Sequence, residues 1–309
     1  MIQPPYLQPG DRVAIVAPAR KIAPTEIAAA ISLLRSWQLE VVLPDHLYDI
    51  DNQFAGDDAT RARTLQQQLD DPSIHAIFCA RGGYGTVRII DRLDFSRFCQ
   101  HPKWIVGYSD ITVLHSHIHR HLGIETLHAI MPINIPTDAL QNPYPATDTL
   151  HHALFGKELS YSFPLHPLNR AGNAQGQLIG GNLSILYSLC GSSSDIDTDG
   201  KILFIEDLDE YLYHIDRMMT NLKRCGHLAH LAGLVVGQMS DMHDNTIPFG
   251  LTAEQIIRHA VEEYPYPVCF NFHAGHNGTD NRALILGNPA TLTINSSHTT
   301  LTFCPNTPS

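Results

Sequence analysis

The sequence lacks the features that mark several large classes of protein. Its 309 residues contain no low-complexity tract and no block of like charge, so the whole chain is able to bury apolar surface. Lysine and arginine number 20 against 31 aspartates and glutamates, which gives a formal charge of -11. No basic stripe is present to neutralise a row of phosphates. We therefore expect no nucleic-acid partner.

The amino terminus also lacks a targeting or membrane signal. Residues 1–10 contain neither lysine nor arginine, and the apolar run Val13–Ala17 is far too short for a signal sequence or a membrane helix. The six cysteines form no Cys-x-x-Cys pair, a distribution typical of buried, reduced thiols rather than of a disulfide framework. These absences predict a cytoplasmic protein with no membrane partner.

What is present is an alternation of short apolar runs and helical patterns. A chain of this length exceeds the usual domain size of about 100–200 residues, so we expect two cores with a cleft between them. In the first half, strands are expected at 12–17, 41–43, 74–79 and 104–106, and helices at 24–37, 58–69 and 86–93. This alternation predicts an α/β fold with a doubly wound parallel sheet. Ligands of such sheets collect beyond the carboxyl ends of the strands, here near Ala17, Ala80 and Gly107.

A segment rich in glycine, proline and polar residues divides the chain. We expect an N-terminal domain over residues 1–155, a linker over 156–177 and a C-terminal domain over 178–309. In the second domain, helices are expected at 178–190, 210–224 and 252–262, and strands at 202–205, 234–236, 268–271 and 290–294. Each domain then has its own core, and the site lies between them.

Ser109 stands in Gly107-Tyr108-Ser109-Asp110, between an apolar strand and a helical pattern. Such a strand-turn-helix elbow exposes a hydroxyl and aims the first helical amides at the group it attacks, as in serine hydrolases. The second glycine of a Gly-x-Ser-x-Gly elbow is missing, because Ile111 holds its position. Serine is also a preferred helix N-cap, so the motif alone leaves both a nucleophile and an N-cap open.

A glycine loop, Arg81-Gly82-Gly83-Tyr84-Gly85, follows the strand before the elbow. It fits neither the GxxxxGK[ST] nor the GxGxxG spacing of phosphate-binding loops. A tight turn is the simplest interpretation. If Ser109 is a nucleophile, the backbone amides of Gly85 and Asp110 are the candidate donors of an oxyanion hole.

Glu206 follows the expected strand at 202–205 and opens an acidic run. Asp209 and Glu210 in that run fit the role of acids at the start of the next helix, where they favour the helix dipole. Glu206 fits that role less well. A carboxylate at the end of a strand is held rigidly, so we take Glu206 as a candidate catalytic acid.

Two groups of histidines invite a metal hypothesis. His273 and His276 lie in one loop without a further nearby ligand, which is a weak zinc pattern. Imidazole titrates near neutrality, so a general base is the stronger role for His276. The run from His115 to His121 contains i,i+4 pairs that point to different helix faces, again without a third ligand. We expect the histidines of this run to be hydrogen-bonded within the protein or exposed to water.

Taken together, these segments resemble the serine LD-carboxypeptidase family, also called murein tetrapeptide carboxypeptidases. The similarity spans nearly the whole chain. It is carried by the order and spacing of GDRVAIVAPA (10–19), ARGGYG (80–85), GYSDIT (107–112), IEDLDEYLYHIDRM (205–218) and AGHNGTDNRALILG (274–287).

The resemblance implies an N-terminal domain like class I amidotransferases and a smaller C-terminal domain of the swivelling β/α type. It implies a catalytic triad of Ser109, Glu206 and His276, an oxyanion hole of the Gly85 and Asp110 amides, no metal or cofactor, and a homodimer. The implied reaction removes the terminal D-alanine of a murein tetrapeptide after the L-centre of a diamino acid, in peptidoglycan recycling.

Two alternatives stay open at this stage. A microcin C immunity-type peptidase, which cleaves an aminoacyl-nucleotide amide, would keep the same three residues. A non-catalytic amidotransferase-like binding module would not need them. The cation for the terminal carboxylate is also open, because Arg81 and Arg88 lie near the site in sequence and either fits a structural ion pair.

Overall fold

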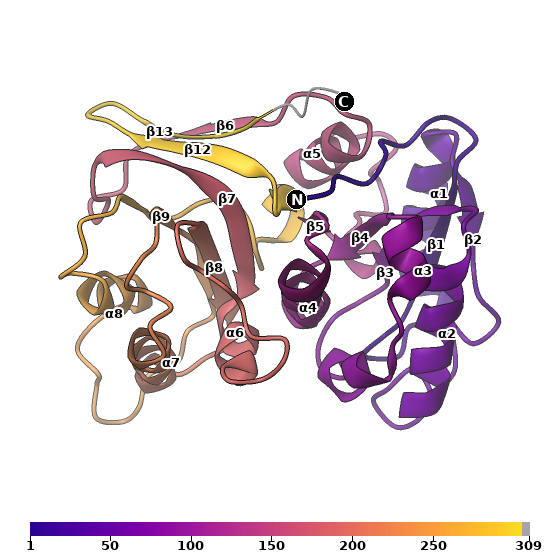
Figure 1. Ribbon diagram of the computed structural model, residues 1–309, viewed down its shortest axis with the longest axis horizontal. Coiled ribbons are helices and arrows are strands. Elements are labelled where there is room, and N and C mark those ends of the chain that lie inside the picture. Colours follow the sequence, from indigo (N-terminus) through magenta and orange to yellow (C-terminus); the bar gives the residue numbers. More distant parts are fainter. Residues whose placement is uncertain (305–309) are drawn as a thin grey trace.

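The computed structural model describes residues 1–304; the last five residues of the expected C-terminal domain lie outside the described residues. Two β-sheets with their helices form two lobes, and helix α4 lies between them (Figure 1). One apolar cluster joins the lobes, because Leu127 and Ala129 of the first share it with Leu178 and Phe204 of the second. The two halves of the chain are therefore packed together by a common core.

The first sheet confirms the expected doubly wound fold. Its parallel strands run in the order β2-β1-β3-β4-β5, which is the flavodoxin-like order of open α/β sheets. The strands are β1 (Arg12–Val16), β2 (Glu40–Val42), β3 (Ile74–Cys79), β4 (Trp104–Gly107) and β5 (Thr126–His128). Helices α1 (Ala28–Ser36), α2 (Asp58–Asp70), α3 (Ser96–Gln100), α4 (Thr112–Leu122) and α5 (Pro145–Leu154) accompany them. Strand β11 (Leu284–Leu286) completes the sheet by pairing antiparallel with β5.

The second sheet is mixed. Its order is β10-β9-β8-β7-β12-β13-β6, with β7 to β10 parallel and the remaining strands antiparallel. The strands are β6 (Ser160–Phe163), β7 (Gly172–Asn182), β8 (Ile202–Leu208), β9 (Gly233–Ser240), β10 (Val268–Cys269), β12 (Pro289–Ile294) and β13 (Thr299–Phe303). Helices α6 (Leu183–Leu189), α7 (Leu212–Arg224) and α8 (Ala253–Ala260) pack on it through a second apolar cluster that includes Leu186, Met219 and Ile257.

Three local expectations differ from the structure. The segment 156–177, expected as a linker, contributes β6 and the first part of β7 to the second sheet. The helix expected at 178–190 begins only at Leu183, because Gly180 and Gly181 have φ angles of 122° and 146° and a Cβ on Gly180 would collide with the backbone of Phe204. The helix expected at 86–93 is two 3-10 turns, η2 (Thr86–Arg88) and η3 (Ile90–Arg92).

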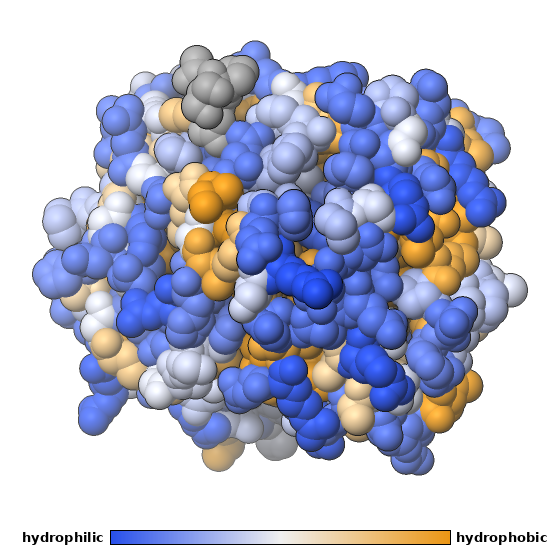
Figure 2. Space-filling view, turned by 45° about the vertical axis from the view of Figure 1, so that its right-hand side comes forward, coloured by the Kyte–Doolittle hydropathy of each residue, from blue (hydrophilic) through white to orange (hydrophobic). Residues whose placement is uncertain are grey.

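On the face drawn in Figure 2, hydrophilic side chains predominate and apolar ones gather in small, separate groups. Within residues 1–304, no helix combines the length and the apolar character needed to cross a membrane.

Candidate active site

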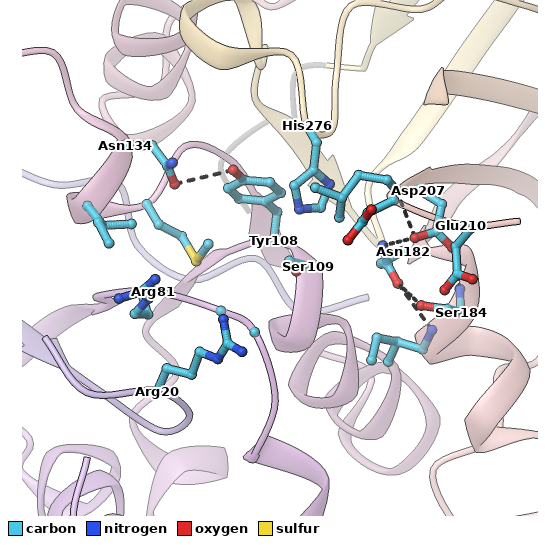
Figure 3. Close-up of a pocket in the computed structure, with 17 residues that line it drawn as sticks. Arg20, Arg81, Tyr108, Ser109, Asn134, Asn182, Ser184, Asp207, Glu210 and His276 are labelled. Carbon is cyan, nitrogen blue, oxygen red and sulfur yellow. Dashed lines mark hydrogen bonds between the residues drawn. The ribbon is translucent and has the colours of Figure 1, made fainter. Parts of the chain in front are cut away.

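Ser109 begins a 3-10 turn, η4 (Ser109–Ile111), between β4 and α4. Its φ angle is 62°, in the left-handed region that strains a residue with a side chain and that clusters at functional sites. This backbone geometry is the one expected of a nucleophile elbow. Ser109 lines a cavity of about 480 Å³ to which both lobes contribute residues (Figure 3).

Ile111 does not prevent the elbow, although it replaces the usual second glycine. Its side chain packs against Gly107, where a Cβ would lie 2.9 Å from Cγ1 of Ile111 and 3.2 Å from Cβ of Cys79. The close approach of helix and sheet therefore depends on the glycine before Ser109 instead of the one after it.

The carboxylate of Asp110 ties the glycine loop to the elbow. It is 1% exposed and accepts a hydrogen bond from the backbone N–H of Thr86 at 2.9 Å. A backbone hydrogen bond from Gly85 also reaches it. Burial raises the pKa of Asp110 above its ordinary value, against the lowering effect of these hydrogen bonds. The glycine loop and the turn at Ser109 are thus joined as one unit.

The part of the glycine loop beside Ser109 differs from the expected one. A Cβ on Gly82 would lie 3.2 Å from Oγ of Ser109 and 3.4 Å from the amide nitrogen of Asp110, and Gly82 and Gly83 line the cavity. Gly85 points elsewhere, because its backbone bonds to the Asp110 carboxylate and its carbonyl accepts a hydrogen bond from Arg61 at 3.0 Å. The segment Gly82-Gly83 therefore lies beside Ser109, and the expected role of the Gly85 amide stays a prediction.

Glu206 and His276 form a buried pair. Glu206 is 0% exposed and lies at a β-bulge of β8 against β9, between Ile205 and Asp207. Its Oε2 accepts hydrogen bonds from Nδ1 of His276 at 2.7 Å and from the backbone N–H of His276 at 3.2 Å. Bulges often aim a side chain next to an active site. Here the bulge directs the carboxylate at the imidazole.

Gly275 makes room for this pair. Its φ angle is 107°, and a Cβ at this position would lie 2.6 Å from Oε2 of Glu206. Both the backbone angle and the close approach require glycine. The sequence Ala274-Gly275-His276 therefore sets the imidazole on the carboxylate.

The environment of His276 favours its protonated form. Burial alone would lower the pKa of His276, but the charge of Glu206 and its hydrogen bond outweigh burial, so the pKa is raised. With Nδ1 bonded to Glu206, Nε2 is the remaining nitrogen, and Figure 3 shows the imidazole of His276 facing the space beside Ser109. The ring of Tyr108 packs on it with centroids 4.8 Å apart.

The cavity has walls of opposite charge (Figure 3). Arg20 and Arg81 line it from the first lobe, and Asp207, Asp209 and Glu210 line it from the second. A ligand that carries both a carboxylate and an ammonium group would match this division.

Arg20 has fewer interactions within the protein than Arg81 has. Its guanidinium makes no hydrogen bond or ion pair with any of residues 1–304. Its aliphatic stem lies where a side chain on Gly83 would be. Arg81, in contrast, donates to the carbonyl of Lys21 at 3.3 Å and lies 4.0 Å from Glu26.

Asn182 connects the elbow helix to the acidic wall. Its backbone N–H donates to Oγ1 of Thr112 at 3.0 Å, and its Nδ2 donates to Glu206 at 3.3 Å and to Asp207 at 2.9 Å. Burial and the neighbouring charge of Glu206 raise the pKa of Asp207 to about 7, although the hydrogen bonds oppose the shift. A cation bound beside Asp207 would restore its charged form.

The histidine run of α4 has structural partners. Within residues 1–304, the metal-ligating cluster that the geometry reveals includes none of these histidines. Their bonds are His115 to the Gly107 carbonyl at 2.9 Å, His119 to Thr126 Oγ1 at 3.1 Å, His117 to Ser194 Oγ at 2.9 Å and His121 to the Ser193 carbonyl at 2.7 Å. The run therefore fixes α4 to the sheet below it and to the loop after α6.

The structure thus places two of the three expected residues, Ser109 and His276, at one cavity, with Glu206 buried behind the imidazole, and it adds others. Arg88 is not among them, because its guanidinium pairs with Asp58 at 2.8 Å. Sequence reasoning missed Arg20 and Asn182. Arg20 follows β1 at the carboxyl edge of the sheet, and Asn182 follows two glycines and caps α6. The position of each residue in the sequence could therefore have indicated that it lies near the site.

Comparison with known proteins places this arrangement among characterised families. Residues 13–129 match the family model for the LD-carboxypeptidase N-terminal domain, and residues 175–292 match that for the C-terminal domain. A protein of Bacillus subtilis named probable murein peptide carboxypeptidase is 39% identical over 282 residues, which cover 89% of this chain and 86% of that protein.

Solved structures agree with the fold. The muramoyltetrapeptide carboxypeptidase of Oxalobacter formigenes superposes with a TM-score of 0.86 at 26% identity, over 96% of this chain and 100% of that one. The microcin C7 self-immunity protein MccF, in complex with glutamyl sulfamoyl guanosine, superposes with a TM-score of 0.83 at 19% identity, over 98% of each chain. At that identity the second likeness shows the fold alone.

Proposed function

This chain belongs to the LD-carboxypeptidase family, and we propose that it is a serine carboxypeptidase that releases the terminal D-alanine of murein tetrapeptides. The bond cleaved follows the L-centre of the diamino acid. The observation that carries the proposal is the buried Glu206–His276 pair, joined at 2.7 Å, at a cavity that the strained Ser109 also lines. A cytoplasmic role in peptidoglycan recycling and a homodimeric assembly belong to the same proposal.

The mechanism follows from these atoms. Nε2 of His276 accepts the proton of Ser109 while Oγ attacks the carbonyl carbon, and Glu206 holds the imidazole through Nδ1 and stabilises its charge. His276 then gives its proton to the amine of D-alanine as that group leaves. Water, activated by the same imidazole, hydrolyses the acyl-enzyme and frees Ser109.

The negative oxygen of the intermediate needs backbone donors beside Ser109. We propose the backbone amide of Asp110, in the turn that follows Ser109, as the first donor of the oxyanion hole, as expected from the sequence. For the second donor we replace Gly85 by the Gly82-Gly83 segment, because that segment lies against Ser109 Oγ whereas Gly85 is bonded to the Asp110 carboxylate.

The charged walls explain the choice of substrate. The terminal carboxylate of a tetrapeptide would bind at Arg20, whose guanidinium has no competing partner among the described residues. The side-chain ammonium of the diamino acid would face the acidic wall. Asp209 and Glu210 already contact His243 and His214, whereas the carboxylate of Asp207 accepts from neutral donors. Asp207 is therefore the acid that gains most from a bound cation.

Substituting Arg20 tests the carboxylate site. Arg20→Gln should lower kcat/KM for the tetrapeptide by about 10- to 100-fold, mainly through KM, since a hydrogen bond to a charged group contributes about 1.5–3 kcal/mol. The same substitution should not change kcat/KM for a tetrapeptide whose carboxyl terminus is amidated. Arg97→Gln, at an exposed position of α3, is the matched control. An equal loss on both substrates would contradict the assignment.

The pH dependence of the reaction should report His276. General-base action needs the neutral imidazole, so kcat/KM should fall as pH falls through the pKa of His276. Because that pKa is raised above 6.5, the acidic limb should lie above pH 6.5. In Glu206→Gln the raising charge is gone while burial remains, so the limb should move to lower pH. If the acidic limb of Glu206→Gln stays at the wild-type pH, the pH dependence does not arise from the Glu206–His276 pair.

A direct assay tests the function as a whole. Purified muropeptides incubated with the full chain should lose one D-alanine from the tetrapeptide, detected by mass spectrometry, and keep the D-Ala-D-Ala end of a pentapeptide. The microcin C immunity-type alternative, which has support at the level of fold, would leave the muropeptides intact and would cleave an aminoacyl-nucleotide amide supplied in a parallel incubation. A non-catalytic binding module would cleave neither, and its Ser109 would not react with a fluorophosphonate.

A further inference from the structure

A second cluster of reactive side chains lies away from the active site, where α6 and α7 end. Cys190 is the C-cap of α6, and His227 lies two residues beyond Cys225, the C-cap of α7. Asp195 comes from the loop after α6. One ligand atom from each of Cys190, Asp195 and His227 lies within 4.8 Å of the other two, and all three residues are partly buried.

Two atoms of this cluster have unmet bonding capacity. Nε2 of His227 and Oδ1 of Asp195 form an ion-pair contact at 3.0 Å, but it lacks hydrogen-bond geometry, and neither of these buried atoms has a hydrogen-bond partner among residues 1–304. Buried polar atoms are nearly always satisfied. Two such atoms that face one another without a well-formed hydrogen bond are arranged as two ligands of one ion would be.

The residues that carry these atoms are held in place by other bonds. Oδ2 of Asp195 accepts the backbone N–H of Gly191 at 2.8 Å, which leaves Oδ1 free to face His227. The backbone of His227 donates to the Leu222 carbonyl at 3.0 Å and accepts from Thr198 Oγ1 at 2.8 Å. Supporting bonds of this kind orient the ligands of a metal site.

We propose that Cys190, Asp195 and His227 bind a zinc ion, with Cys225 or a water molecule as the fourth ligand. Thiolate, imidazole and carboxylate together suit Zn²⁺, which takes four ligands at about 2.0–2.3 Å and so holds them about 3.3–3.8 Å apart. The 3.0 Å between His227 and Asp195 is within a few tenths of an ångström of that spacing. Cys225 caps α7 two residues before His227, so its thiol is the candidate protein ligand for the fourth position.

The place of the site gives it a structural role. The loop that carries Asp195 also receives α4, because Ser116 and His117 bond to Ser194 at 2.6 and 2.9 Å and His121 bonds to the Ser193 carbonyl at 2.7 Å. Zinc would clip this loop to the end of α7. The seven residues of α6 separate the site from Asn182 by about 10 Å, so the ion would stabilise the interface of the lobes without entering the reaction.

The test uses the full chain, freed of metal with a chelator and then titrated with Co²⁺ or Zn²⁺ alone. Cobalt should bind with one-to-one stoichiometry and give a thiolate-to-metal charge-transfer band, which zinc should abolish. Zinc should raise Tm and a chelator should reverse the rise, while kcat stays unchanged. Absence of the band, or of any stoichiometric binding, would overturn the proposal whatever the enzyme's activity.

Matched variants locate the ligands. Cys190→Ser should remove the charge-transfer band, and His227→Asn should weaken zinc binding by at least about 100-fold, because even supporting groups of metal sites contribute 10- to 100-fold. Cys304→Ser and His230→Asn, at exposed positions, should behave as wild type. Circular dichroism of the metal-free variants checks folding. If the band survives Cys190→Ser, or if His230→Asn removes binding as His227→Asn does, the site lies elsewhere and the assignment fails.

Discussion

Replacement of Ser109 by alanine should reduce kcat by about 10³- to 10⁶-fold, and His276→Ala should reduce it by a similar factor. The two losses should be similar because the residues act as a unit: without the hydroxyl there is no acyl-enzyme, and without the imidazole the hydroxyl keeps its proton. The measurement is single-turnover release of D-alanine from the tetrapeptide. The double variant should lose little more than either single variant, which independent contributions would not give.

His273 provides the control for the general base. It lies three residues from His276, but its Nδ1 bonds to Asp280 at 2.6 Å and it does not line the cavity. His273→Ala should therefore retain most of the activity. A loss as large as that of His276→Ala would move the base to His273, and full activity of Ser109→Ala would remove the nucleophile assignment. Circular dichroism should show native secondary structure in each variant.

Glu206→Gln should cost about 10³- to 10⁴-fold in kcat, the range typical of a triad acid changed to its amide. Glutamine keeps the shape and the hydrogen bonds to Nδ1 or to the backbone of His276, but it removes the charge that stabilises the imidazolium. It also allows the imidazole to turn its wrong tautomer toward Ser109. The loss should appear in kcat for both good and poor substrates, because the effect concerns the reacting groups.

Asp207→Asn is the matched comparison, one residue along the same strand. Its carboxylate accepts hydrogen bonds from Asn182 and from the amides of Ser184 and Leu208, and it makes no bond to His276. We expect Asp207→Asn to raise KM for a substrate with a diamino acid and to change kcat far less than Glu206→Gln does. The reverse ranking of the two kcat values would identify Asp207 as the orienting acid.

Much of the first sheet could be predicted because its pattern is local. Strands such as β1 and β3 are buried on both faces and read as continuous apolar runs, and the elbow at Ser109 joins such a strand directly to a helix. The failures come from non-local packing. Leu178–Cys190 has helical composition, but Gly180 lies against the backbone of Phe204, a contact between residues 24 positions apart that leaves no local trace.

The same distinction applies to the site. Ser109 follows β4 of the first sheet, whereas Glu206 lies in β8 and His276 comes after β10 of the second sheet. Each was expected at the end of a strand, so their positions between the two domains could be anticipated. Which peptide of the glycine loop faces Ser109 depends on where Asp110 directs its carboxylate, and the sequence Gly82-Gly83-Tyr84-Gly85 does not encode this choice. The availability of Arg20 is likewise a property of the whole fold, since only the assembled structure reveals which arginines already have partners.

The position of β11 has a consequence for the order in which the protein matures. Residues 284–286 supply the outer neighbour of β5, so the first sheet stays incomplete until translation has passed Leu286. Until then β5 presents an open edge, of the kind that favours pairing with other chains. Ser109, the proposed nucleophile, is translated first, whereas His276, the proposed base, and β11, which completes the sheet, follow together much later. A nascent chain that ends before His276 therefore carries the proposed nucleophile without its proposed base, and we expect no hydrolysis from it.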